Sequence, residues 1–437
     1  MKRKIISMLL MGSVIFSMVT YNNAGKVYGE SENLDVAEWN LSEATEIAAE
    51  AHIEASTSAD EWISDSEESS FEYPINSDSS EWAQYETHDE MLAACTVPDE
   101  MLVEMSTEDL INIVLKYPLL CDIFAYDSYK EGLFELAVNF NGLRELLNRE
   151  NGAELLLERY ANYEISTQES ISQVIPDEII NEETEQVDEV LNQILEDDET
   201  VQALEEEFNE VSGVQLLEML LTSDEILSDL DADKQEEFSE IAYEKYCEKQ
   251  ESDLYEGVED TVYQIAEENE NLDVLGEVTR TEEDDIASGS GTTYVKTPKG
   301  SSVQVITSSY KGATWAKNVT AQYKLKYPYA SVLASADNRY NCHSYAWYSA
   351  STSNRYWMNN PSKYTSDGSY KSVGSKPTAS GQKVRWVLNG GILHSGIVYS
   401  YTSSKITITS KWGQAPLMRH SATYSPYAGT RTYYKRA

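Results

Sequence analysis

The distribution of charged residues divides this chain into two unlike parts. Residues 1–285 hold 13 basic and 74 acidic side chains, a net charge of −61, whereas residues 286–437 hold 19 basic and 2 acidic side chains, a net charge of +17. The formal net charge of −44 disfavours nucleic acid as a partner of the whole chain, but this average describes neither part. The change of sign near residue 286 is therefore the clearest domain boundary in the sequence.

A run of small residues lies at this boundary. Residues 286–293 read Ile-Ala-Ser-Gly-Ser-Gly-Thr-Thr, which is a composition typical of a flexible linker. At roughly 150 residues per domain, the chain is long enough for about three domains. We expect a multidomain protein in which this linker separates an acidic N-terminal region from a basic C-terminal domain.

The N-terminus has the pattern of a secretory signal peptide at residues 1–29. Basic residues at positions 2–4 precede an apolar run at residues 5–19, which is too short to span a membrane comfortably. Small residues favour cleavage before Glu30, with Ala24 as the alternative, and no second apolar run of spanning length follows. We therefore expect a secreted protein, extracellular or associated with the cell wall, with no membrane span.

Three acidic stretches of different pattern follow. Residues 30–97 are predicted to be disordered, because residues 30–90 hold 19 acidic side chains, no Lys or Arg and little periodicity. Residues 98–163 are predicted to be a helical domain, and residues 164–285 an acidic helical region, because apolar residues recur there at spacings of three and four. One face defined by this spacing carries Leu133, Leu136, Phe140, Leu143 and Leu147.

Two local patterns in the helical region predict helix caps. Ser106 and Asp109 have the spacing of a capping box, which predicts a helix that begins directly after Ser106. Acidic residues between positions 229 and 240 match several positions of a calcium-binding loop, but Lys234 stands where the sharp turn needs Gly. We favour a capping cluster there, and we expect neither a metal nor a cofactor in the protein.

Cysteines are too few for a disulfide scaffold. The four of them are Cys95, Cys121, Cys247 and Cys342, so stability must come from packing. Cys121 lies in the apolar context Tyr-Pro-Leu-Leu-Cys-Asp-Ile-Phe, which predicts a buried and inert thiol.

The basic region has the composition and alternation of a β-rich domain. Residues 286–437 contain 17 Tyr and 5 Trp but no Phe. Alternating runs at residues 302–307, 382–387 and 405–409 predict strands, and residues 401–405 predict a hairpin turn. We expect an α+β domain at residues 294–437, dominated by an antiparallel sheet.

Cys342 is the strongest candidate for chemistry in this domain. It lies in Asn-Cys-His-Ser-Tyr-Ala-Trp-Tyr, after a loop-like stretch and at the expected start of a helix. The N-terminus of a helix and the nearby Arg339 both favour the thiolate, which is the nucleophilic form. A zinc site is disfavoured, because His343 is adjacent to Cys342 and no ligand-like spacing supports the pair.

His394 is the matching candidate base. It opens the predicted strand His-Ser-Gly-Ile-Val after a Gly-rich turn, where an imidazole facing Cys342 could accept the thiol proton. Its second ring nitrogen then needs an orienting acceptor, and the next strand offers Ser410 or Gln414. His420 is an alternative base or a residue that lines the site.

The order of these motifs resembles that of a known family. The Cys342 helix, a strand after Gly381, the His394 strand and its hairpin partner are similar in order to the CHAP family of cysteine, histidine-dependent amidohydrolases/peptidases, within the papain-like superfamily. The match covers residues 294–434. The resemblance implies a papain-like fold, Cys342 as nucleophile and His394 as general base. This family commonly has Glu, Asp or Asn at the third catalytic position, where this chain offers Ser410 or Lys411.

These patterns leave three hypotheses for function. We favour a secreted cysteine amidase or peptidase that cleaves cell-wall peptidoglycan peptide or another peptide substrate. The alternative is a non-catalytic surface-binding module with a papain-like fold, and a third possibility is a secreted effector that modifies glutamine or cleaves protein in a host. Candidate binding residues are Tyr340, Asn341, Trp412, Gln414 and His420.

The charge division also predicts contact within the chain. The acidic region could lie over the basic domain as an electrostatic lid that salt weakens, since screening acts over about 8 Å at physiological ionic strength. The simpler interpretation is that the acidic region is only a solubilising leader.

Overall fold

The structure is a computed structural model, and it describes only part of the chain. The described residues are 41, 44, 47–48, 55–56, 72–75, 81–181, 185–255, 262, 291–388 and 391–437. The expected signal peptide at residues 1–29, most of the stretch 30–97 and the first part of the expected linker lie outside them. All described residues belong to one compact unit, Glu38–Ala437.

The N-terminal half is helical, as the apolar spacing predicts. Its α-helices are α3 (His88–Cys95), α4 (Asp99–Glu104), α5 (Thr107–Leu115), α6 (Tyr129–Asn139), α7 (Asn141–Leu147), α8 (Gly152–Ala161), α9 (Glu178–Asn181), α10 (Glu185–Ile194), α11 (Asp198–Leu221), α12 (Asp224–Leu227) and α13 (Ala232–Gln250). Short 3-10 turns accompany them: η2 (Trp82–Gln84), η3 (Leu120–Ala125), η4 (Ile171–Val174) and η5 (Asp253–Tyr255). We call residues 81–255 the helical half.

Side-chain caps define where several of these helices begin. The Ser106 hydroxyl accepts a hydrogen bond from the Asp109 N–H at 3.1 Å, which confirms the predicted start of α5. Asp231 caps α13 by accepting from the Lys234 N–H at 2.9 Å, so this part of the calcium-like pattern is a helix cap. The single face predicted from Leu133 to Leu147 belongs to two helices, α6 and α7, because Phe140 between them has extended backbone angles.

The prediction of disorder is wrong for residues 81–97. Thr87 and Glu90 form a complete capping box that opens α3. Trp82 is buried and its indole N–H donates to the Lys326 carbonyl at 3.0 Å. Residues 81–97 are therefore ordered despite their acidic composition, because they contain a helix cap and a buried apolar side chain.

The C-terminal half is built on a seven-stranded antiparallel sheet in the order β3-β8-β7-β6-β5-β9-β4. Its strands are β3 (Ser331–Ala334), β4 (Tyr370–Gly374), β5 (Lys383–Leu388), β6 (Gly391–Tyr401), β7 (Ile406–Lys411), β8 (Leu417–Ser421) and β9 (Thr430–Arg436). The hairpin β1 (Gly291–Lys296) and β2 (Ser302–Thr307), the helices α16 (Ala313–Lys326) and α17 (Lys363–Ser366), and the π-helical turn η7 (Ser344–Tyr348) complete it. We call residues 291–437 the sheet half.

Two boundaries in the sheet half bear on the sequence predictions. The predicted hairpin turn is confirmed, because the Thr402 N–H donates to the Lys405 carbonyl at 2.7 Å between β6 and β7. The expected linker is too long at its end, since Gly291, Thr292 and Thr293 already pair with β2.

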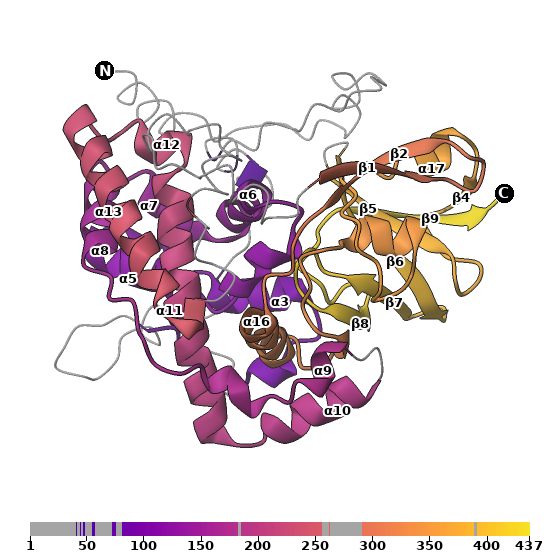
Figure 1. The fold of residues 1–437 in the computed structure, drawn as a ribbon, viewed down its shortest axis with the longest axis horizontal. Coiled ribbons are helices and arrows are strands. Elements are labelled where there is room, and N and C mark those ends of the chain that lie inside the picture. The colour runs from indigo at the N-terminus through magenta and orange to yellow at the C-terminus, as the bar shows by residue number, and fades with distance from the viewer. Residues whose placement is uncertain are drawn as a thin grey trace. The chain divides into compact units, whose positions relative to one another are not determined.

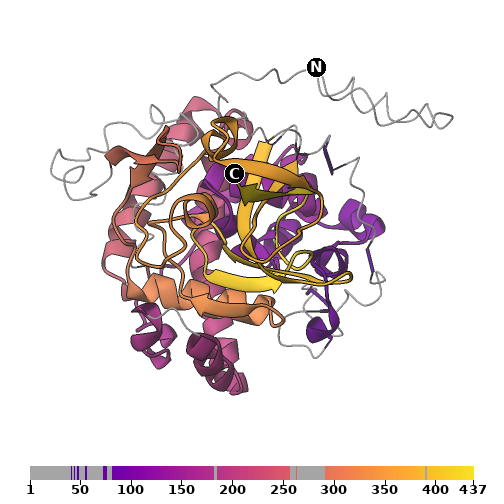
Figure 2. The same cartoon turned by 90° about the vertical axis from the view of Figure 1, so that its right-hand side faces the viewer.

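The helical half and the sheet half share one apolar core. A single cluster of buried residues runs from Leu110 and Phe124 in the helical half to Trp386 and Trp412 in the sheet half. The helix α16 contacts α10 and α11 of the helical half and β3 of the sheet half, and α10 also contacts β3 directly. Figure 1 shows α16 near the middle of the molecule, beside α11. Seen from the side of the sheet, helices of the helical half lie behind the strands (Figure 2).

No helix within the described ranges has both the length and the apolar character needed to cross a membrane.

Candidate functional site

Cys342 begins a short helical turn that continues through η7. Asn341 caps this turn, because its side-chain oxygen accepts from the Ser344 N–H at 3.1 Å and from the Met358 N–H at 3.2 Å. The Cys342 side chain is only 1% exposed. Its sulfur lies 3.4 Å from Nδ1 of His343.

The thiol meets the edge of strand β6. Among the described residues, β6 pairs with β7 only from Ile397 onward, whereas its first half pairs with β5 alone. The backbone N–H of Ser395 is therefore open on the β7 side, and it hydrogen-bonds the Cys342 thiol. This contact places Cys342 beside the residue that directly follows His394.

His343 is held by a chain of hydrogen bonds. The Trp347 indole donates to the Ser395 hydroxyl at 2.9 Å, and the same hydroxyl is hydrogen-bonded to Nδ1 of His343 at 2.8 Å. Nε2 of His343 faces Asp127, whose Oδ2 is 3.6 Å away. Nδ1 of His343 therefore contacts both the Ser395 hydroxyl and the Cys342 sulfur.

His394 is fully buried and stacks on Tyr427. The ring centroids are 3.6 Å apart and the planes differ by 10°. Among the described residues neither ring nitrogen of His394 has a hydrogen-bond partner. Side chains alternate along β6, so His394 lies on the face with Trp386, opposite to Ser395. In this arrangement His394 and Cys342 are neighbours through the backbone and not through a side-chain hydrogen bond.

Ser410 orients a different histidine from the expected one. Its hydroxyl accepts from the Trp412 indole at 3.1 Å and donates to Nε2 of His420 at 2.8 Å. Nδ1 of His420 donates to the Ser421 carbonyl at 2.8 Å. His420 is thus fully partnered, and the Ser410 hydroxyl contacts His420 in place of His394.

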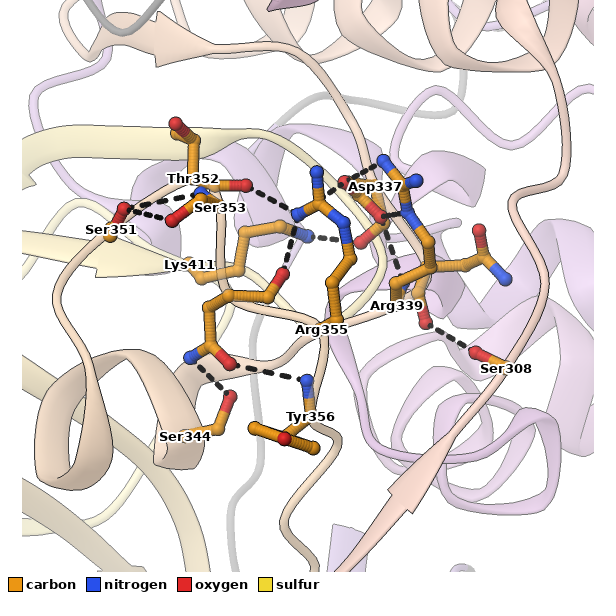
Figure 3. Close-up of polar contacts among 12 residues, drawn as sticks. Ser308, Asp337, Arg339, Ser344, Ser351, Thr352, Ser353, Arg355, Tyr356 and Lys411 are labelled. Carbon is orange, nitrogen blue, oxygen red and sulfur yellow. Dashed lines mark hydrogen bonds and ion pairs between the residues drawn. The ribbon is translucent and has the colours of Figure 1, made fainter. Parts of the chain in front are cut away.

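Lys411, the last residue of β7, stabilises the turn that follows this strand. Its buried ammonium donates to the carbonyls of Asp337, Gly413 and Ala415 at 2.8, 2.8 and 2.5 Å. Burial lowers the pKa of Lys411 to about 7, while the Asp337 carboxylate favours its charged form. Figure 3 shows Lys411, Arg339 and Arg355 converging on Asp337.

The other basic residue near the thiol is also engaged. Arg339 holds the Asp337 carboxylate through Nε at 2.9 Å and Nη2 at 2.7 Å, and its guanidinium lies 4.4 Å from the centre of the Tyr310 ring. This pairing directs the charge of Arg339 toward Asp337.

The other candidate binding residues, Tyr340, Asn341 and Gln414, have structural contacts, as Trp412 and His420 do. The Tyr340 ring lies 4.9 Å from Nζ of Lys411. Asn341 donates to Oδ1 of Asp127 at 3.0 Å, and the Gln414 N–H donates to the Phe124 carbonyl at 2.8 Å. Asn341 and Gln414 therefore bind the helical half in this state.

Burial keeps the Cys342 site neutral. It raises the pKa of Cys342 well above its usual value, and the Asp127 carboxylate adds to this rise, while the backbone donors of Ser395 and His343 oppose it. Burial likewise lowers the pKa of His343 to about 3 and the pKa of His394 well below 6.5. The site holds a thiol and neutral imidazoles, with no ion pair between them.

Sequence reasoning missed three residues of this site. Asp127 lies in the acidic half without any motif, Tyr427 is one of many tyrosines, and Ser395 was treated only as part of the His394 strand. Of the three, only Ser395 had a usable signal, because it directly follows the candidate base.

Within the described ranges, no group of three or more His, Cys, Asp or Glu residues is arranged to hold a metal ion. Compared with family models, with curated proteins and with solved structures, the chain matches none of them.

Proposed function

We propose that the protein is a secreted cysteine amidase or peptidase of CHAP type with a papain-like catalytic domain, in which Cys342 is the nucleophile and His394 the general base. Its substrate is the peptide of cell-wall peptidoglycan or another peptide amide. One observation carries the proposal: the Cys342 thiol touches the backbone of Ser395, next to a buried imidazole whose two nitrogens have no partner among the described residues. A buried histidine without partners costs stability, so its retention favours a chemical role.

The chemistry follows from these groups. After His394 turns toward the sulfur, its neutral imidazole accepts the thiol proton, and the thiolate attacks the amide carbon. The imidazolium then donates that proton to the leaving amine, and water hydrolyses the thioester with His394 again as base. The backbone N–H groups of His343 and Ser395, which favour the thiolate of Cys342, are the donors that would stabilise the oxyanion.

His343 serves as a positioning residue in this scheme. Ser395 and Trp347 fix its ring beside the sulfur, so it limits the rotamers of Cys342 without exchanging protons.

The first prediction tests the nucleophile and the base. Cys342→Ala and His394→Ala should each lower amide hydrolysis by about a thousandfold or more, because the two groups act as one unit. Release of amines from peptidoglycan or peptide substrates is the readout. Cys247→Ala, at an exposed thiol on α13, is the matched control and should keep native activity. Activity that survives in His394→Ala but not in His420→Ala would transfer the role of base to His420.

The neutral state of Cys342 favours a second candidate, the non-catalytic binding module. Binding of cell walls by both the native protein and the Cys342→Ala variant, without hydrolysis by either, would support this alternative.

A further inference from the structure

Residues 124–127 of the helical half span the end of the 3-10 turn η3 and the two residues after it, and they lie against the Cys342 site. The Phe124 carbonyl accepts from the N–H groups of Gln414 at 2.8 Å and Ala415 at 3.4 Å. The next carbonyl, that of Ala125, accepts from the Tyr427 hydroxyl at 2.6 Å. Two successive carbonyls of this segment are thus held by donors of the sheet half.

The same segment fixes the side chain that covers His394. The Tyr126 hydroxyl donates to the Pro426 carbonyl at 2.7 Å, and its ring meets the edge of the Tyr427 ring at 5.7 Å. Tyr427 in turn stacks on His394. Residues 125 and 126 thus hold Tyr427, the side chain that stacks on the candidate base.

Asp127 is the last residue of this segment. Its carboxylate accepts from the Asn341 amide at 3.0 Å and stands 3.6 Å from Nε2 of His343. The Asp127 side chain is 18% exposed, while the His343 side chain behind it is fully buried. Asp127 therefore separates the Cys342 site from solvent.

Backbone packs directly on backbone beneath the segment. Gly413 has φ of +51°, and a Cβ atom there would lie 2.5 Å from the carbonyl carbon and oxygen of Ala125. Two backbones can approach this closely only where one of them has a glycine, here Gly413.

We propose that residues 124–127 close the Cys342 site in cis, by occupying the backbone donors and the Asn341 amide that a peptide substrate uses. Proteins bind an extended peptide through donors to its main-chain carbonyls and to its side chains. Residues 124–127 are held in this way, by main-chain N–H, hydroxyl and amide donors. The helical half is then an internal inhibitor, and release of this short segment opens the site. The assignment of a peptide substrate rests on the proposed function, whereas the closure itself does not.

Gly413→Asn in the full chain tests the closure. Asn tolerates the left-handed backbone, so the substitution mainly introduces atoms where Ala125 lies. Gly381→Asn is the matched control, because Gly381 also has a positive φ of +79° but nothing within 4 Å of its added Cβ atom. Asp127→Ala is a second opening variant, since it removes the contacts to Asn341 and His343 without adding bulk.

The readout is the alkylation rate of each cysteine with a dilute thiol reagent at neutral pH, followed by mass spectrometry. Cys247 is exposed and reports the unhindered rate, while Cys95 and Cys121 are buried and report global unfolding. In the native chain Cys342 should react at least about a hundredfold more slowly than Cys247. In Gly413→Asn and in Asp127→Ala its rate should rise at least about tenfold, with Cys95 and Cys121 still protected, and Gly381→Asn should behave as the native chain.

Three results overturn the closure. One is a Cys342 that stays protected in both opening variants, and another is a Cys342 that already reacts as fast as Cys247 in the native chain. The third is a joint rise in the alkylation rates of Cys95, Cys121 and Cys342 in both variants, which makes the segment an inseparable part of the fold.

Hydrolysis of peptide amides by Asp127→Ala separates the two proposals. A gain of hydrolysis supports both the closure and the peptide substrate. Faster alkylation without any hydrolysis upholds the closure and contradicts the proposed function.

Discussion

Asp127 differs from the carboxylates that usually accompany a catalytic histidine. Such a carboxylate accepts a short hydrogen bond from the imidazole and orients it, but the Oδ2 to Nε2 distance of 3.6 Å at His343 is too long for that. Its shorter bond is to Asn341. Asp127 therefore acts on the site through burial and charge, and both of these oppose ionisation of Cys342.

A pH series measures the effect of Asp127 on stability. Burial raises the pKa of Asp127 to about 7, so the stability gained from its protonated form is lost as pH rises from the unfolded value of about 4 to about 7. Asp127→Asn is neutral throughout. The free energy of unfolding of this variant, relative to the native protein, should therefore increase by roughly 1–2 kcal/mol between pH 5 and pH 8 in urea titrations.

Asp367→Asn is the control for this series. Despite some desolvation, hydrogen bonds from Thr297 and Ser369 lower the pKa of Asp367 to about 2. Its contribution is lost only as pH falls toward 2, so its difference from native should stay constant between pH 5 and pH 8. Parallel curves for both variants would contradict a raised pKa at Asp127.

Residue-scale predictions succeeded where a local rule applied. Ser106 caps α5 and Cys121 is buried, because a cap and an apolar context depend on neighbours in the sequence. The partner of Asp127 is Asn341, 214 residues away, and no short pattern reveals such a pair. The catalytic roles of Cys342 and His394 stay predictions.

At the scale of elements, α16 determines how the two halves join. Its lysines extend into the acidic half: Lys324 meets Asp188 at 2.9 Å and Lys317 meets Asp177 at 2.5 Å. In sequence, α16 carries an apolar face at Trp315, Val319 and Tyr323, but the polar residues around it do not show that its lysines are buried as well. Its burial depends on acidic partners from elsewhere in the chain, which periodicity cannot show.

A pair of substitutions tests whether burial decides the value of these ion pairs. The Asp188 side chain is 17% exposed and also accepts from the Val332 N–H, whereas Asp177 is 83% exposed. Asp188→Ala should lower the free energy of unfolding by about 3 kcal/mol, because it leaves a buried ammonium without its carboxylate. Asp177→Ala should cost about 0–1 kcal/mol. Equal losses in chemical denaturation would contradict this division.

The predictions of elements failed where the composition or the periodicity of a whole stretch differed from what single residues within it specify. Thr87 and Glu90 form a capping box that the sequence displays, but the acidic composition of residues 30–97 suggested disorder. Conversely, Phe140 fits the apolar spacing of one helix although it separates α6 from α7. Composition and periodicity describe a stretch as a whole, whereas caps and breaks depend on single residues.

At the scale of the whole molecule, the acidic and basic halves hold each other by more than long-range attraction. Their interface includes a common apolar core and buried ion pairs such as Lys326 with Glu205 at 2.5 Å. Salt screens buried pairs weakly, so we expect the halves to stay together at high ionic strength, unlike a purely electrostatic lid. Lysines that pair with acidic residues in this interface also reduce the positive charge that the sheet half presents at its surface.

Truncation tests this interdependence. The chain reduced to residues 291–437 loses the partners of Tyr323 and Tyr327, whose hydroxyls donate to the Cys121 carbonyl and the Asp122 carboxylate at 2.7 Å. It should bind the dye ANS and lack the sharp near-ultraviolet circular dichroism of the full chain, because its core becomes exposed. A cooperative unfolding transition in the truncated chain would show that the sheet half is autonomous.

The contact between Ala125 and Tyr427 joins residues 302 positions apart. This separation bears on when the closed site forms during folding. A chain is synthesised from its N-terminus, so residues 124–127 exist before Tyr427 and before the strand that carries His394. Contacts so distant in sequence form late in folding. We therefore expect the Cys342 thiol to become enclosed in the same late step that packs the sheet half against the helical half, so that no folded molecule with an open site precedes it.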